Sequence, residues 1–154
     1  MYTLVVVDMQ PQFRSSQNQT TKKSVNNLLK KAVKDKAAII FLEFGGYDRT
    51  DSELMATVQG YKRAFYRTKH ENDGSDEVLE TIQKQALPRR KLKVCGVNTN
   101  YCVRETVEGL IDKFNDKSGI GKVIEVDSKA VNCAFYHESG LDKLREMQNV
   151  KVID

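Results

Sequence analysis

The chain has 154 residues, the length of one ordinary domain, and we expect a single domain over residues 1–154. Hydrophobic residues make up 40% and charged residues 30%, with only 2 prolines, a composition that excludes collagen-like and broadly disordered chains. No apolar run is long enough to span a bilayer, and no basic-then-apolar leader opens the sequence. We therefore expect a cytoplasmic protein without a membrane partner.

The formal net charge is +4, and many of the cations gather in two clusters. The clusters comprise Lys22, Lys23, Lys30, Lys31, Lys34 and Lys36, and Arg89, Arg90, Lys91 and Lys93. A nucleic-acid surface would combine such clusters with interleaved aromatic residues. These clusters flank apolar periodic stretches and are poor in aromatic residues, which is typical of solvated surface. We expect no nucleic-acid partner.

Three cysteines, Cys95, Cys102 and Cys133, are too few and odd in number for a disulfide scaffold. No pair of them has zinc-ligand spacing, and His70 and His137 are the only histidines. The sequence therefore predicts no structural zinc site.

Short apolar runs alternate with amphipathic stretches along the chain. The first run predicts a buried strand at 2–7, and helical spacing follows at 25–33. The pattern continues with a strand at 37–44, a short helix at 53–58, a weaker strand at 64–68, and a helix at 78–86 that Pro88 terminates. It then predicts a strand at 92–97, a helix at 103–114 ended by Gly119 or Gly121, a strand at 122–126, a helix at 135–147 and a strand at 150–153.

This alternation predicts a parallel sheet with helices on both faces, a three-layer α/β/α sandwich. Ligands in such folds bind beyond the carboxyl ends of the strands, near the point where strand order reverses. Residues that directly follow each apolar run are therefore the candidates for a site.

Three chemically active side chains fall at these strand ends. Asp8 follows the first strand and is either a proton-transfer acid or a turn residue. Lys69 follows the third strand and either enters the same crevice or faces solvent. Cys102 lies in the first turn of a helix, where the dipole lowers a thiol pKa, although a small buried cysteine is an equally good interpretation. Together they supply the base, cation and nucleophile of an acyl transfer.

Two segments make the sequence similar to a known family. Residues 5–10, followed by Phe13, resemble the opening strand and acid of the isochorismatase-like cysteine hydrolases. Residues 96–103, followed by Thr106, resemble their G-[VI]-x-T-x-x-C-V nucleophile motif. The resemblance implies a doubly wound, Rossmann-like sandwich with a six-stranded parallel sheet.

The family's lysine commonly precedes an N-D-[AG]-F segment, and Lys69 precedes Asn72-Asp73-Gly74 here. Ser75 replaces the usual phenylalanine. Lys62, before Ala64-Phe65, is a rival, since K-x-x-S-A-F is a variant of the same segment. We prefer Lys69 because it follows the third predicted strand, whereas Lys62 precedes it.

The resemblance implies a catalytic triad of Asp8, Lys69 and Cys102. It also implies a cis peptide bond between Val97 and Asn98, and an oxyanion hole made by the backbone N–H groups of Asn98 and Cys102. We also expect Gln10, Phe13 and Tyr101 to line the substrate pocket.

Metal-binding nicotinamidases share an Asp-x-His pair after the second strand. The corresponding segment of this sequence, residues 43–48, contains no histidine. We therefore expect no metal and no cofactor.

The expected function is hydrolysis of a C–N bond in a small amide or ureide through a cysteine thioester, by a homo-oligomer (dimer or tetramer). One alternative is a non-catalytic binding or assembly protein with the same fold. Another is a redox protein that uses Cys95 and Cys102 as a dithiol.

Overall fold

The computed structural model describes residues 1–114 and 123–154, so the expected helix end at Gly119 or Gly121 lies outside the described residues. The strands are β1 Thr3–Val7, β2 Ala38–Phe44, β3 Ala64–Lys69, β4 Lys91–Val97, β5 Val123–Asn132 and β6 Val150–Ile153. The helices are α1 Gln19–Lys34, α2 Ser52–Thr57, α3 Ser75–Gln85, α4 Arg104–Phe114 and α5 His137–Glu146. Two short turns, η1 Arg14–Gln17 and η2 Thr99–Val103, precede α1 and α4. Across the described ranges no helix combines the length and apolarity that crossing a membrane requires.

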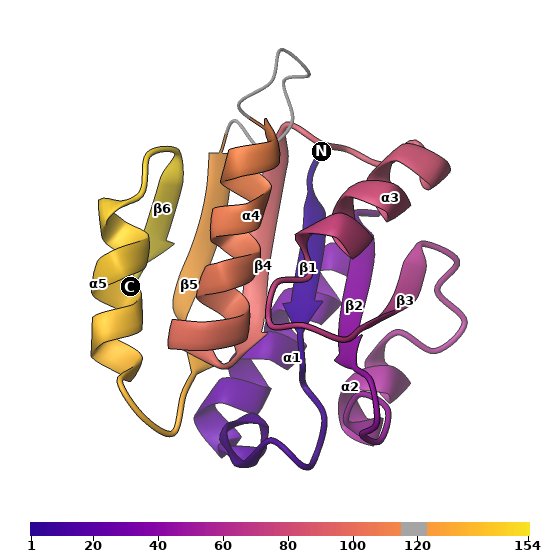
Figure 1. Cartoon of the computed structure of the whole chain (residues 1–154). Coiled ribbons are helices and arrows are strands. Elements are labelled where there is room, and N and C mark those ends of the chain that lie inside the picture. The colour runs from indigo at the N-terminus through magenta and orange to yellow at the C-terminus, as the bar shows by residue number, and fades with distance from the viewer. Residues whose placement is uncertain (115–122) are drawn as a thin grey trace.

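The six strands form one sheet in the order β3-β2-β1-β4-β5-β6, and every neighbouring pair is parallel (Figure 1). This confirms the predicted six-stranded parallel sheet. Strand order reverses between β1 and β4, the two central strands. The helices that follow β1 and β4, α1 and α4, therefore pack on opposite faces of the sheet. Open α/β sheets bind ligands at such a switch point, beyond the carboxyl ends of the strands.

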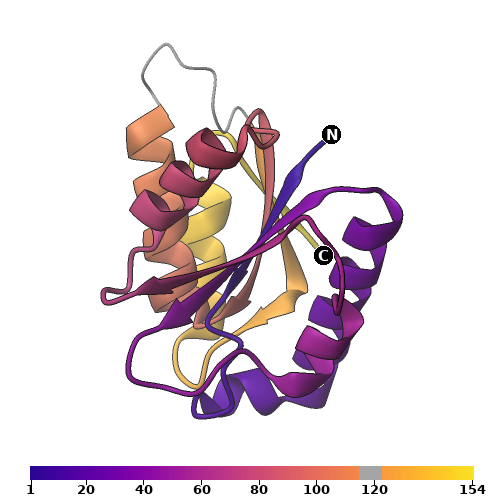
Figure 2. The same ribbon diagram turned by 90° about the vertical axis from the view of Figure 1, so that its right-hand side faces the viewer.

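Side chains of the central strands alternate between two separate cores. Val5 and Val7 of β1 pack in the core beneath α3, α4 and α5, whereas Leu4 and Val6 pack in the core beneath α1 and α2. All four are buried, as expected for a strand covered on both faces. Figure 2 shows the three layers edge-on, with the two helical layers on opposite sides of the sheet.

Gly96 allows β1 and β4 to approach at the switch point. Its φ is +115°, and a Cβ atom there would lie 2.1 Å from the backbone oxygen of Val7. Any larger residue would therefore push apart the two strands whose ends carry Asp8 and the segment leading to Cys102.

Four elements differ from the sequence prediction. Helix α1 begins at Gln19, six residues before the predicted start at 25. The turn at 99–103 is a π-helix, which hydrophobic periodicity does not reveal. Helix α3 ends at Gln85, and Ala86 adopts a left-handed conformation. The helix therefore ends before the point at which Pro88 would terminate it. Strand β5 extends to Asn132, six residues beyond the predicted end, through a register shift opposite Val94 and Gly96. The polar residues in its second half hide the strand from apolar-run analysis.

Candidate active site

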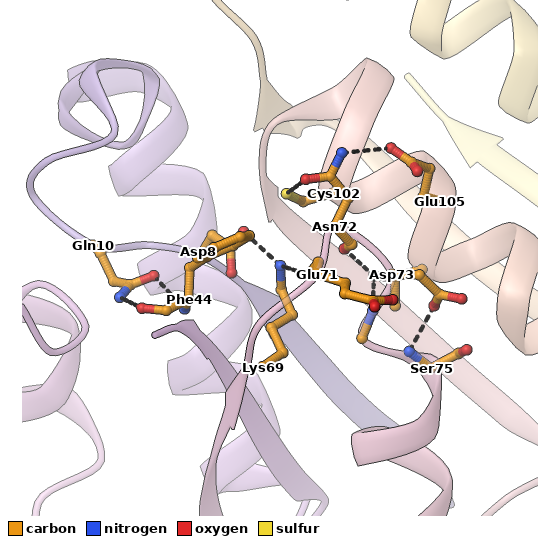
Figure 3. A network of polar contacts seen from close by, with 12 residues as sticks. Asp8, Gln10, Phe44, Lys69, Glu71, Asn72, Asp73, Ser75, Cys102 and Glu105 are labelled. Carbon is orange, nitrogen blue, oxygen red and sulfur yellow. Dashed lines mark hydrogen bonds and ion pairs between the residues drawn. The ribbon is translucent and has the colours of Figure 1, made fainter. Parts of the chain in front are cut away.

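Asp8 and Lys69 form a buried ion pair at the carboxyl edge of the sheet (Figure 3). Lys69 Nζ lies 3.0 Å from Asp8 Oδ2, and neither side chain has any exposed surface. The two residues come from the ends of β1 and β3, so the parallel topology brings them together across more than sixty positions of sequence. A lysine and an aspartate are rarely buried this completely unless they are paired.

The surroundings of Lys69 hold its ammonium group in one place. Nζ also donates a hydrogen bond to the carbonyl of Glu71 at 2.9 Å and lies 4.4 Å from the centre of the Phe44 ring. Gly74 makes room for the lysine stem, since a Cβ atom there would lie 2.9 Å from Cδ of Lys69. These contacts replace part of the hydration that the buried cation loses.

Asp8 has the properties of a base whose carboxylate can accept a further proton. Its φ is +51°, a left-handed conformation that is uncommon for a residue other than glycine and occurs often at functional sites. Burial raises the pKa of Asp8, whereas the Lys69 charge and the Cys102 thiol act in the opposite direction. Lys69 Nζ lies 3.0 Å from Oδ2, so that oxygen faces the ammonium group, whereas Oδ1 has no hydrogen-bond partner among the described residues. Oδ1 is therefore the oxygen that can take a proton.

Cys102 lies in the π-turn η2, with 4% of its surface exposed. Burial and the nearby Asp8 charge raise the pKa of the Cys102 thiol to about 12, despite the Lys69 charge that lowers it. The expectation that the helix start lowers this pKa is therefore wrong for the resting protein. Desolvation and the neighbouring Asp8 carboxylate favour the neutral form, and the resting sulfur is a thiol.

The peptide bond between Val97 and Asn98 is cis, as the resemblance implies. The backbone N–H of Asn98 donates to no described residue, whereas its side-chain oxygen accepts a hydrogen bond from Ser15 at 2.6 Å. Cys102 follows four residues later in the same turn. An N–H that lacks a partner beside a thiol is a candidate donor to an oxyanion.

The three expected pocket residues lie in different environments. Both N–H groups of the Gln10 amide donate to backbone carbonyls, at Phe44 and Asp48, so this buried side chain anchors the loop after β2. Phe13 packs against Phe44 and Tyr47, with ring centres 6.3 and 5.0 Å apart. Tyr101 is 41% exposed beside Cys102 in the chain.

Two rival assignments fall at other positions. Lys62 is exposed and precedes β3, at the opposite edge of the sheet from Asp8. Cys95 is buried in the core beneath α1 and α2, whereas Cys102 packs in the core on the other face of the sheet. All three cysteines are free. The dithiol interpretation is therefore wrong for this structure.

Asn72 contacts Cys102, and Glu105 contacts Asn72; sequence analysis missed both roles. The Cys102 thiol donates to Asn72 Oδ1 at 3.6 Å, and Asn72 Nδ2 donates to Glu105 Oε2 at 2.9 Å (Figure 3). The Asn72-Asp73-Gly74 segment was a signal for the first residue. Glu105 had none, because an acid on a helix surface is common.

Solved structures with this fold include enzymes of different kinds. The nicotinamidase from Staphylococcus aureus is 18% identical, with 98% of each chain covered and a TM-score of 0.78. The pyrazinamidase of Pyrococcus horikoshii in complex with zinc is 18% identical, with 99% of this chain and 98% of that chain covered and a TM-score of 0.71. The MAR1 ribonuclease from Caenorhabditis elegans is 15% identical, with 98% and 76% covered and a TM-score of 0.81. At these identities the likeness shows the fold alone.

The side chains after β2 do not fit a metal ion of the kind held by the Pyrococcus protein. Glu43 accepts hydrogen bonds from both the backbone and the hydroxyl of Thr50, at 2.7 and 3.0 Å, and pairs with Arg49. In residues 1–114 and 123–154 no three His, Cys, Asp or Glu side chains cluster as metal ligands would. We derive no chemical step through a metal.

Sequence comparison identifies the family directly. No curated protein sequence matches the chain significantly. The isochorismatase domain model, however, matches residues 2–113, which includes β1 to β4, Asp8, Lys69 and Cys102. The chain belongs to the isochorismatase family.

Proposed function

We propose that this protein is a metal-independent hydrolase that cleaves a C–N bond of a small amide or ureide through a thioester on Cys102. One observation carries the proposal: a fully buried Asp8–Lys69 pair lies beside a thiol, and Oδ1 of Asp8 has no hydrogen-bond partner among the described residues. Such an arrangement costs stability and gives the fold no obvious benefit. It suits a base that must receive a proton from Cys102.

The raised pKa values of the two groups support the same chemistry. A thiol with a pKa near 12 transfers its proton poorly to an ordinary carboxylate, but burial also raises the pKa of Asp8. The gap between donor and acceptor is thereby smaller than it would be in water. Lys69 stabilises negative charge wherever it resides, first on Asp8 and then on the sulfur.

The reaction follows in two half-steps. Asp8 accepts the thiol proton while Sγ of Cys102 bonds to the carbonyl carbon, and the N–H groups of Asn98 and Cys102 stabilise the resulting oxyanion. The C–N bond then breaks, and the proton on Asp8 passes to the departing nitrogen, which leaves as ammonia or an amine. In the second half-step Asp8 takes a proton from water as the hydroxide oxygen attacks the thioester carbon. The C–S bond then breaks, the proton on Asp8 passes to the sulfur to restore the thiol, and the acid leaves.

Relatives by fold support an amide substrate without identifying it. Neighbours by fold are named nicotinamidase and pyrazinamidase, after nicotinamide and pyrazinamide, and both compounds are aromatic carboxamides. The Phe44 ring lies 4.4 Å from Lys69 Nζ, and Phe13 and Tyr47 pack against Phe44. These rings would offer apolar surface to a flat substrate. We therefore include aromatic carboxamides together with aliphatic amides and ureides among the candidates.

The test is release of ammonia from a panel of these compounds by the wild-type protein and by Cys102→Ala. We expect at least one compound to be hydrolysed and the variant to be inactive on it. Circular dichroism controls for folding of the variant. Absence of turnover across the panel would favour the non-catalytic alternative, and turnover by Cys102→Ala would refute the thioester.

A further inference from the structure

The loop after β3 inserts one amide between two side chains of the η2–α4 segment. Asn72 Oδ1 lies 3.6 Å from Sγ of Cys102, and Asn72 Nδ2 lies 2.9 Å from Oε2 of Glu105 (Figure 3). Cys102 and Glu105 are three residues apart, a spacing that puts side chains on one face of a helix. A single amide therefore bridges the sulfur and the carboxylate.

Glu105 determines which end of the amide faces the sulfur. An ionised carboxylate only accepts hydrogen bonds, so the NH₂ end of Asn72 must face Glu105. The amide oxygen then faces Cys102. Without the carboxylate, either end of the amide could face the sulfur, because the two ends have nearly the same shape.

The two orientations have opposite effects on the sulfur. An amide oxygen accepts a hydrogen bond from a thiol but repels a thiolate, whereas an amide NH₂ group stabilises the thiolate. We propose that Glu105 is a positioning residue, which acts through Asn72 to hold Cys102 as a thiol until its proton passes to Asp8. The inference rests on the proposed function, because it concerns the same nucleophile. It adds a control on when that nucleophile forms.

The loop itself is held by contacts that do not involve Glu105. Thr106 Oγ1 accepts a hydrogen bond from the backbone N–H of Gly74 at 2.9 Å and lies 3.4 Å from the carbonyl of Asn72. Lys69 Nζ donates to the carbonyl of Glu71 at 2.9 Å. Replacing Glu105 therefore changes the orientation of the amide while the backbone that carries it stays in place.

The test is Glu105→Gln, since glutamine can both donate and accept and so no longer fixes the Asn72 amide. We expect Cys102 to react with iodoacetamide about three- to tenfold faster at mildly alkaline pH. The reason is that a hydrogen bond that stabilises the thiol is replaced by one that stabilises the thiolate. Peptide mapping by mass spectrometry distinguishes Cys102 from the other cysteines. Glu108→Gln is the matched control, because Glu108 lies one turn along α4 and pairs with Arg104.

A double-mutant cycle separates the amide from the charge of Glu105. Removing a negative charge lowers a nearby thiol pKa by itself, and this direct effect would persist in an Asn72→Ala background. Our proposal predicts that Glu105→Gln accelerates alkylation less than about twofold in that background. Equal acceleration in both backgrounds, or none in the wild-type background, would overturn it.

Thiolate absorbance separates ionisation from access. Titration of each variant against Cys102→Ala should place the midpoint of thiolate formation about half a unit to one unit lower in Glu105→Gln. Faster alkylation without this displacement would mean that the loop merely opens, and the proposal would fall. None of these measurements needs a substrate, so they remain decisive even if the amide panel shows no turnover.

Discussion

Two lysine–aspartate pairs in different regions show how far environment changes the same contact. At the carboxyl edge of the sheet, Asp8 and Lys69 lie 3.0 Å apart with no exposed surface. On the outside of α3 and α4, Asp76 and Lys113 lie 2.6 Å apart, with side chains 73% and 35% exposed. The shorter contact belongs to the exposed pair, which water screens, so breaking that pair costs only about 0–1 kcal/mol.

The buried pair is different because either partner alone would be an uncompensated charge. Breaking such a pair costs about 3–5 kcal/mol, although a buried pair as a whole adds little stability. The pair therefore matters less for the stability of the fold than for the proton transfer that a desolvated carboxylate can carry out. The comparison predicts large effects at Asp8 and Lys69 and small effects at Asp76.

Replacing the base should have the largest effect on turnover. Asp8→Asn keeps the size of the side chain but cannot accept the Cys102 proton, so we expect turnover to fall by about 10²–10⁴-fold. Steady-state release of ammonia from the active compound measures it. Turnover within tenfold of wild type would mean that another group is the base.

Replacing the buried cation should have the largest effect on stability. Lys69→Met keeps the length of the side chain and leaves Asp8 unpaired, so we expect the free energy of unfolding to fall by about 3–5 kcal/mol at mildly alkaline pH. The loss should be smaller in acid. The pKa of Asp8, already raised by burial, rises further without the Lys69 charge, and a protonated carboxyl no longer needs a partner.

The sign of this pH dependence is specific. A carboxyl whose folded pKa lies above its unfolded value loses stability as pH rises between the two values, and the loss is complete above the folded value. Urea unfolding of Lys69→Met and wild type at several pH values measures it. The activity of the variant should also shift to higher pH, because Asp8 must ionise to act as a base. A stability loss that is the same at every pH would contradict this account.

The matched substitution in the exposed pair should have a small effect. Asp76→Asn makes the same chemical change as Asp8→Asn at a site that water reaches. We expect unfolding to change by less than about 1 kcal/mol and turnover to stay at the wild-type level. An effect as large as that at Asp8 would show that burial is not what distinguishes the two regions.

Removal of metal should have the smallest effect. Glu43, near the carboxyl end of β2, already accepts hydrogen bonds from Thr50 and pairs with Arg49. We expect ammonia release to be unchanged after exhaustive chelation, and elemental analysis to find no stoichiometric zinc or iron. Loss of activity that zinc restores would overturn metal independence.

The sheet and its carboxyl edge were predictable because they depend on local pattern and on topology. Buried runs such as 2–7 and 92–97 identify the central strands, and parallel connections carry Asp8 and Lys69 to one edge. The thiol pKa was not predictable. It depends on burial and on the distance between Cys102 and Asp8, and a single sequence contains neither quantity.

The polar contacts around the site were also hidden in the sequence. Asn72 and Glu105 lie 33 positions apart, and both residue types are common on surfaces. Gln10 is expected to line the pocket, and the sequence does not reveal that its amide also anchors the loop after β2. Side-chain partners of this kind are set by tertiary packing, and neither spacing nor propensity reveals them.

The central claim is that Cys102 forms a covalent thioester, and trapping that intermediate tests it most directly. The protein would be mixed with the amide that the panel identifies, quenched in acid within the first turnovers, and digested for peptide mapping by mass spectrometry. We predict that the peptide containing Cys102 gains the mass of the acyl group, that hydroxylamine removes it, and that Cys102→Ala gains none. Turnover with no adduct on Cys102, or with an adduct on Cys133, would contradict the account.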